Sequence, residues 1–200
     1  MDVSGKGLLY LINDLLDVSK IAAGKFTIDD TEFDLDALLD EIKTIFYKRA
    51  EEARLSFKVS SSLHCSTLLR GDGHRISQIL INLLGNAVKF TEQGSVTLTI
   101  SELEAIDGSE LPQLSMVVQD QGIGISPEVM EQLFQPFEQA DRSISRRFGG
   151  TGLGLHISMT LAQMMEGDIE VSSEEGVGSC FQLNLPYQID RESRVERDQE

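Results

Sequence analysis

Hydrophobic residues recur at helical spacing in four stretches of the chain. These stretches are residues 8–21, 34–52, 72–90 and 156–165. Apolar side chains three or four positions apart lie on one face of an α-helix, so each stretch is predicted to form a helix with a buried side. The first stretch begins abruptly and ends at Gly24, and we therefore expect it to be a fragment of a longer helix.

Five shorter segments carry the apolar and β-branched pattern of strands. These segments are residues 55–59, 96–103, 114–118, 169–171 and 180–185. Residues 26–33 are predicted to be an extended connector, and residues 105–113, with Gly and Pro between two strands, a surface loop. Five strands together with several helices predict an α+β sandwich.

Composition narrows the range of partners. The chain has 17 Lys and Arg residues against 33 Asp and Glu residues, which gives a formal net charge of -16. This charge repels nucleic acid and anionic membranes, so no nucleic-acid partner is expected, and a polyanionic ligand would need local basic groups. No apolar run reaches the roughly 18 residues of a membrane span. Cys65 and Cys180 are too few for a disulfide framework. We therefore expect a cytoplasmic domain, from a parent protein that is either free or anchored in the inner membrane.

The helix at residues 72–90 carries a narrow polar face. At about 100° per residue, its polar positions fall within an arc of roughly 80°. They are Arg75, Gln78, Asn82, Asn86 and Lys89. Two buried amides one turn apart indicate either an internal polar network or a ligand. Lys89 favours the ligand, because a cation beside amide oxygens suits phosphate together with a hard metal ion such as Mg²⁺.

Asp120 follows an apolar strand and is itself followed by Gly122 and Gly124. Glycine permits the backbone to approach a ligand closely, and a carboxylate at this place can accept a hydrogen bond from the exocyclic amine of adenine. An ordinary tight turn or helix cap, in which Asp and Gly are common, is the alternative.

A second glycine cluster, residues 149–154, precedes the last predicted helix. Free backbone N–H groups at a helix start bind anions, so phosphate is the expected ligand. The cluster lacks the Lys-Ser/Thr of a P-loop and does not follow a strand, which disfavours P-loop and dinucleotide-binding folds. Residues 138–147, which contain three arginines, are typical of a mobile lid, and equally of a solvated loop.

In chain order, these features resemble the sequence boxes of the histidine kinase branch of the GHKL ATPase superfamily. The N box is matched by residues 72–91, the first glycine box by residues 120–125, the F box by residues 134–137 and the second glycine box by residues 149–155. The resemblance spans residues 33–186. It implies a two-layer α/β sandwich, in which a mixed, mainly antiparallel sheet of about five strands is covered by about three helices, with a further helix at the N-terminus.

The resemblance also implies a site for ATP and Mg²⁺. Asn82 is expected to coordinate Mg²⁺, and Asn86 and Lys89 to contact the phosphates. Asp120 is expected to bind the adenine amino group, and Arg146 to reach from the lid toward the γ-phosphate. Asn82, Lys89 and Arg146 are the expected catalytic residues. The remaining ATP-binding residues that the resemblance implies are Phe90, Gly122, Gly124, Gly150, Thr151, Gly152, Leu153 and Gly154.

Residues 11–20 are similar to the second helix of the family's dimerisation and phosphotransfer hairpin. The first helix of that hairpin bears the phosphoacceptor histidine, and His64, His74 and His156 do not lie in such a setting. The resemblance implies four segments: residues 1–24 as the partial hairpin helix, 25–33 as a connector, 34–188 as the catalytic ATP-binding domain, and 189–200 as a polar tail or linker.

The partners implied by the resemblance are the histidine helix of the parent protein, the receiver domain of a response regulator, and a second copy of the full-length parent. The chain alone is expected to be mostly monomeric and unable to phosphorylate itself.

The expected function is therefore transfer of the ATP γ-phosphate to a histidine on another helix. One alternative is a nucleotide-responsive pseudokinase that controls a partner through its lid. Another is a GHKL ATPase of the chaperone or topoisomerase kind, which activates water with a glutamate on the N-box helix. No acidic residue lies between Arg75 and Lys89, which argues against the ATPase.

Overall fold

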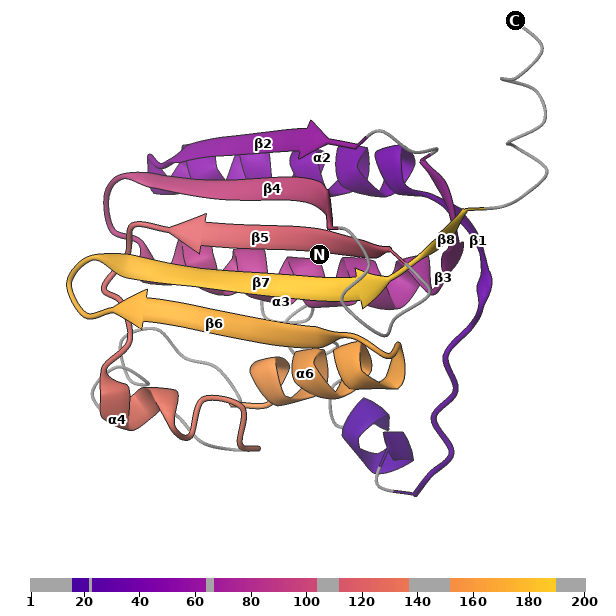
Figure 1. The fold of residues 1–200 in the computed structure, drawn as a ribbon. Coiled ribbons are helices and arrows are strands. Elements are labelled where there is room, and N and C mark those ends of the chain that lie inside the picture. Colours follow the sequence, from indigo (N-terminus) through magenta and orange to yellow (C-terminus); the bar gives the residue numbers. More distant parts are fainter. Residues whose placement is uncertain (1–15, 22, 64–66, 104–111, 137–151, 190–200) are drawn as a thin grey trace, which may run out of the picture.

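The computed structural model describes residues 16–21, 23–63, 67–103, 112–136 and 152–189. Its main sheet consists of β2 (Ser56–Ser62), β4 (Ser95–Leu103), β5 (Gln113–Asp120), β6 (Asp168–Glu174) and β7 (Gly178–Pro186). The strand order is β2-β4-β5-β7-β6. One face of this sheet is covered by α2 (Leu35–Ala53), α3 (Gly73–Phe90) and α6 (Gly154–Met164), as Figure 1 shows. The predicted α+β sandwich is confirmed.

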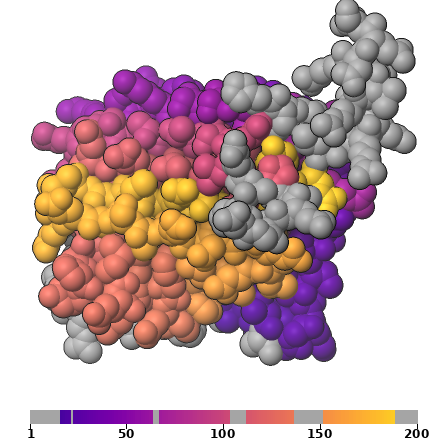
Figure 2. Space-filling view, viewed as in Figure 1, coloured from indigo at the N-terminus to yellow at the C-terminus, as the bar shows by residue number. Residues whose placement is uncertain are grey.

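The sheet is mixed, as expected. β2 runs parallel to β4, whereas the other three neighbouring pairs are antiparallel. Alternate residues of each strand point toward the helices, and on β4 these are the fully buried Val96, Leu98 and Ile100. The opposite face of the sheet is turned toward the viewer in Figure 2, with the residues of β7 forming a band across the middle.

Helix α3 is the central element of the helical layer and contacts both α2 and α6. Its buried residues lie on one side of the helix, whereas the polar face and the neighbouring stripe of Ser77, Ile81, Gly85 and Val88 are only partly buried. The buried residues of α3 are Ile76, Ile79, Leu80, Leu83, Leu84 and Ala87. They join one hydrophobic cluster with side chains from α2, α6 and the sheet, and that cluster holds the polar face of α3 in a fixed orientation.

Two aspartates fix where the long helices begin. The side chain of Asp34 accepts hydrogen bonds from the backbone N–H groups of Asp36 and Ala37 and caps α2. Asp72 caps α3 through the N–H of Arg75 and also accepts from the N–H of Asp29, at 3.0 Å each. Side-chain oxygens in these positions satisfy N–H groups that have no partner within the helix.

The three predicted helices at residues 34–52, 72–90 and 156–165 are confirmed with ends shifted by at most two residues. Of the predicted first helix only residues 16–21 are described, and they are helical. Cys180 is a free thiol, while Cys65 and most of the predicted 105–113 loop lie outside the described residues.

A second, smaller sheet lies at one end of the molecule and was not predicted. It has the order β1-β3-β8, with β1 (Thr31–Asp34), β3 (Leu68–Gly71) and β8 (Gln188–Ile189). β1 occupies the end of the segment expected to be a plain connector. The short helix α4 (Pro127–Met130) follows the first glycine box. Within the described ranges, no helix has the length and apolar character needed to cross a membrane.

Candidate nucleotide-binding site

Asp120 lies at the end of β5 with its carboxylate buried among backbone groups. Its Oδ1 accepts hydrogen bonds from the N–H of Gly122 at 2.8 Å and from the N–H of Ser179 at 3.3 Å. Burial raises the pKa of Asp120, and the two N–H donors act in the opposite direction. In the described part of the chain, no hydrogen bond to Oδ2 is present. This oxygen can therefore accept a proton donor from outside the protein.

The first glycine box fastens Asp120 to the C-terminal end of α3. The N–H of Ile123 donates to the carbonyl oxygen of Phe90 at 3.2 Å. A Cβ atom on Gly122 would come within 2.4 Å of that same oxygen, and one on Gly124, whose φ is +68°, within 2.0 Å of the carbonyl oxygen of Glu174. The close approach that requires glycine at these two positions is thus to the protein's own backbone, where a ligand had been expected.

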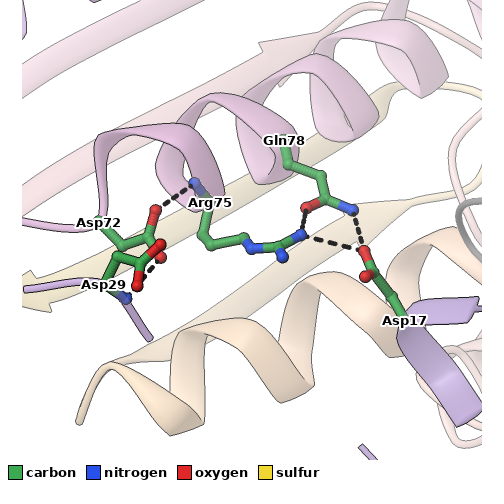
Figure 3. A network of polar contacts seen from close by, with 5 residues as sticks. All are labelled: Asp17, Asp29, Asp72, Arg75 and Gln78. Atoms are coloured by element: carbon green, nitrogen blue, oxygen red, sulfur yellow. Dashed lines mark hydrogen bonds and ion pairs between the residues drawn. The ribbon is translucent and has the colours of Figure 1, made fainter. Parts of the chain in front are cut away.

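The polar face of α3 divides into two halves with different partners. In the first half, Arg75 and Gln78 form an internal polar network with Asp17 (Figure 3). In the second half, the amide of Asn86 is only partly buried, and no hydrogen bond to it occurs among the described residues. The sequence had left open whether this face meets a network or a ligand. The structure shows a network at its start and available polar atoms toward its end.

Asn82 lies at the boundary between the two halves. Its Nδ2 donates to the hydroxyl oxygen of Ser158 on α6 at 2.9 Å. Its Oδ1 faces the start of α6, where a Cβ atom on Gly154 would lie only 2.4 Å away. Gly154 therefore allows α6 to begin directly against the Asn82 amide, and the hydrogen bond to Ser158 orients the amide oxygen.

Lys89 follows one turn after Asn86 and is half-buried. Its Nζ lies 4.6 Å from the centre of the Phe90 ring, and burial lowers the pKa of its ammonium group. A phosphate group beside Lys89 would stabilise the charged form of the ammonium group, which burial disfavours. The cation and the aromatic ring together make this end of α3 suited to an anionic ligand.

The second glycine box is described from Gly152 onward, where it leads into α6. Gly152 adopts a positive φ of +71°, and no side chain among the described residues caps the helix. The N–H groups in the first turn of a helix have no partner within the helix, and such groups can bind an anion. Leu153 is buried at the helix N-cap. His156 binds the Phe134 carbonyl through Nδ1 at 3.0 Å and serves packing. Of the predicted site residues, Arg146, Gly150 and Thr151 lie outside the described ranges, as does the predicted lid at residues 138–147.

The residues present fit a magnesium ion held mainly by a bound ligand. Within the described ranges, no group of three or more His, Cys, Asp or Glu side chains could cage a metal. Asn82 offers one oriented amide oxygen. Mg²⁺ commonly takes one or two protein oxygens and completes its shell with phosphate oxygens and water. A cavity of about 230 Å³ lies elsewhere, between the small sheet and the C-terminal end of α6, and contains none of these residues.

The chain is similar to a well-defined group of proteins. Residues 71–189 match the family described as histidine kinase-, DNA gyrase B- and HSP90-like ATPases. The autoinducer 2 sensor kinase/phosphatase LuxQ of Vibrio cholerae is 42% identical over 186 residues, which are 93% of this chain and 21% of LuxQ. The sensor protein GacS of Pseudomonas syringae is 41% identical over 196 residues, 98% of this chain and 21% of GacS. The chain thus spans about a fifth of the length of these relatives.

Solved structures agree with the sequence relatives. Full-length ShkA in complex with AMPPNP superposes with a TM-score of 0.76 at 35% identity, over 92% of this chain and 36% of ShkA. The catalytic domain of histidine kinase ThkA superposes with a TM-score of 0.64 at 27% identity, over 79% of this chain and 95% of that domain. The chain therefore belongs to the family of histidine kinase-, DNA gyrase B- and HSP90-like ATPases, as a catalytic ATP-binding domain of the sensor histidine kinase type.

Proposed function

We propose that this domain binds ATP with Mg²⁺ along the polar face of α3 and transfers the γ-phosphoryl group to a histidine on a separate helix. The contrast between the two halves of that face supports the proposal. Arg75 and Gln78 are engaged with Asp17. Oδ2 of Asp120 and the amide of Asn86 have no hydrogen-bond partner within the described part of the chain. No fully buried side-chain nitrogen or oxygen among the described residues lacks a hydrogen-bond partner, so these two groups reach the surface, where a ligand can bind them.

The adenine would lie at the C-terminal end of α3. Asp120 Oδ2 would accept a hydrogen bond from the exocyclic amine, which guanine does not present at that place. The glycine box supports this role, because it holds the carboxylate through Oδ1 and leaves Oδ2 for the base.

The phosphates would extend from there along α3 toward its N-terminus. Lys89 and Asn86 would contact them, and the start of α6 would supply backbone N–H groups at Gly152 and Gly154. Mg²⁺, bound by Asn82 and the phosphate oxygens, would neutralise the charge that develops on them. We place Arg146, Gly150 and Thr151 in the same site on the strength of the sequence boxes.

The chemical step needs positioning and neutralisation of charge rather than a nucleophile from this domain. The lone pair of an imidazole nitrogen attacks the γ-phosphorus and forms a P–N bond. The bond from the γ-phosphorus to the bridging oxygen breaks, and that electron pair leaves with ADP. The proton on the other ring nitrogen is released to water.

The relatives indicate where the acceptor and the next partner would come from. LuxQ and GacS are sensor proteins about five times as long as the matched segment, and one solved neighbour is histidine kinase ThkA in complex with the response regulator TrrA. We infer that the phosphorylated histidine of the parent protein passes its phosphoryl group to a receiver domain.

Isothermal titration of the 200-residue chain with AMPPNP and Mg²⁺ tests nucleotide binding, and saturable Mg²⁺-dependent heat is the expected result. A chimaera tests transfer: the matched segment of LuxQ is replaced by this chain, and incorporation of ³²P from γ-labelled ATP is measured. Asn82→Ala should abolish incorporation. Ser158→Ala, which removes only the hydrogen-bond partner of Asn82, should retain part of it.

Two results would count against the proposal. Normal incorporation in Asn82→Ala would remove Asn82 from the site. Nucleotide binding without any transfer in the chimaera, accompanied by release of free phosphate, would favour the ATPase alternative.

A further inference from the structure

Three side chains join the segment that precedes the catalytic domain to α3. Nη1 of Arg75 lies 3.0 Å from Oδ2 of Asp17 and donates to Oε1 of Gln78 at 2.7 Å. Nε2 of Gln78 donates to the same Asp17 oxygen at 3.0 Å. Figure 3 shows the three contacts as a closed triangle. Asp17 is 58 positions before Arg75 in the chain and 61 positions before Gln78. We call Asp17, Arg75 and Gln78 the docking triad.

The docking triad is shielded from water, unlike an ordinary surface ion pair. The side chains of Arg75 and Asp17 are 20% and 11% exposed, and the guanidinium carbon of Arg75 lies 4.5 Å from the centre of the Phe26 ring. In the Lys43–Asp40 pair on α2, by contrast, the exposed fractions are 36% and 73%. Exposed pairs contribute little, whereas removing one partner of a shielded pair leaves a buried charge.

The position of the docking triad along α3 gives it a functional meaning. The glycine box that holds Asp120 contacts Phe90 at the C-terminal end of α3. Lys89, Asn86 and Asn82 follow toward the N-terminus over roughly 10 Å, at about 1.5 Å per residue. Gln78 is the next polar residue on the same face, one turn before Asn82. A nucleotide whose adenine meets Asp120 therefore directs its terminal phosphate toward the docking triad.

We propose that Arg75 and Gln78 are positioning residues that hold the helix at residues 16–21 beside the terminal phosphate, so that the acceptor carried with this helix meets the γ-phosphorus. This inference rests on the proposed phosphotransfer. Asp17 is the group they grip, and it lies on the helix that enters the catalytic domain. The docking triad acts on the geometry of transfer, while nucleotide binding depends on the other half of α3.

Single substitutions that remove the charge test the proposal with little change in volume. Asp17→Asn and Arg75→Gln should lower the rate of ³²P incorporation in the LuxQ chimaera at saturating ATP tenfold or more, with an unchanged KM for ATP. In the 200-residue chain, the Kd for AMPPNP should change by less than twofold. Amide hydrogen exchange at residues 16–21 should become at least tenfold faster. The double variant Asp17→Arg with Arg75→Asp, which exchanges the two charges, should recover most of the rate. The conservative variant Arg75→Lys should recover part of it.

Lys43→Gln is the matched control, because it breaks an ion pair of similar length that is exposed on α2. It should alter neither the rate nor the exchange of residues 16–21. A wild-type rate in Asp17→Asn and Arg75→Gln would overturn the proposal, and so would a raised rate, which would make the contact inhibitory. A parallel loss of AMPPNP affinity would overturn it too, since Arg75 would then act on the nucleotide.

Failure of the proposed function would look different. In that case the wild-type chain would not bind AMPPNP, or the wild-type chimaera would incorporate no phosphate. Hydrogen exchange at residues 16–21 would still report whether the docking triad holds the helix, and unchanged exchange in both single variants would overturn the inference without reference to kinase activity.

Discussion

Asp120 combines two demands that oppose each other. Burial raises the pKa of its carboxyl group and so favours the neutral acid, whereas accepting a hydrogen bond from an adenine amine requires a lone pair that the carboxylate supplies best. The N–H groups of Gly122 and Ser179 offset part of the cost of burial. The residue is thus maintained at some expense of stability, which is typical of binding sites.

Asp120→Asn should separate the two demands. The asparagine oxygen still accepts a hydrogen bond from the N–H of Gly122. The NH₂ group that replaces Oδ2 is a donor and cannot accept a hydrogen bond from the adenine amine. The Kd for AMPPNP should therefore rise tenfold or more, which corresponds to a loss of about 1.4 kcal/mol in binding free energy. The unfolding free energy at neutral pH should not fall, because no charge is buried. Titration calorimetry and urea unfolding measure the two quantities, and a variant that binds as the wild type does would remove Asp120 from adenine recognition.

The pH dependence of stability follows from the direction of the same shift. Because the folded-state pKa of Asp120 lies above its ordinary value of 3.8, the protonated carboxyl stabilises the fold at low pH. This contribution is lost as the pH rises through the raised folded pKa. The difference in unfolding free energy between Asp120→Asn and the wild type should therefore grow from about pH 4 to neutral pH. A constant difference would show that burial does not perturb this carboxyl.

Single residues also show what the sequence could and could not reveal about the site. The helical period placed Asn82, Asn86 and Lys89 on one face, and the strand pattern placed Asp120 at a strand end; both placements are confirmed. The same helical period grouped Arg75 and Gln78 with these ligand-binding candidates. It could not show that Asp17, 58 positions away from Arg75, lies against both, because such contacts depend on how whole elements pack.

Among the secondary structure elements, α3 and the first glycine box depend on each other. The box needs glycine because Gly122 lies against the last carbonyl groups of α3, and the turn is closed by the bond from Ile123 to Phe90. Gly85, in the middle of α3, has no such constraint, since a Cβ atom there would meet no atom within 4 Å. The two glycines therefore differ in what an added methyl group does.

Gly122→Ala should destabilise the fold by about 1–3 kcal/mol, because the methyl group would overlap the Phe90 oxygen and push the box away from α3. Gly85→Ala should stabilise it by about 0.5–1 kcal/mol through the higher helix propensity of alanine. Urea unfolding of both variants gives the comparison. Equal effects would mean that the backbone approach at Gly122 is not maintained in solution.

Element prediction succeeded where a pattern had room to repeat. The long helices carry several turns, and their ends were predicted to within two residues; the five strands of the main sheet were found, but β2 and β6 each extend three residues beyond the predicted end. β1, β3 and β8 contain only two to four residues. Their pairing joins distant parts of the chain, as in Phe33 opposite Leu69 and Leu69 opposite Ile189. A pattern of two to four residues is too short to predict a strand or the strand with which it pairs.

On the scale of the whole molecule, the catalytic domain has a single core. One hydrophobic cluster includes buried side chains from α2, α3, α6 and the main sheet, and Phe26 and Tyr187 from the segments at either end of the domain also belong to it. No layer has a separate core among the described residues. The family match at residues 71–189 thus covers only part of a structural unit that also requires α2 and β2.

Thermal unfolding of the chain should therefore occur in one cooperative transition. Loss of any layer exposes the shared cluster, so partly folded states are unfavourable. Differential scanning calorimetry should give a calorimetric enthalpy equal to the van't Hoff enthalpy. Two resolved transitions, or a van't Hoff enthalpy well below the calorimetric one, would show that the segment before α3 folds separately.

The order of the main sheet also bears on behaviour at high concentration. β6 is one of its two outer strands, and its exposed positions include Asp168, Glu170 and Glu174. Rows of like charge on an outer strand repel a second copy that approaches in register. The acidic side chains of β6 therefore disfavour extension of the sheet from one molecule into the next.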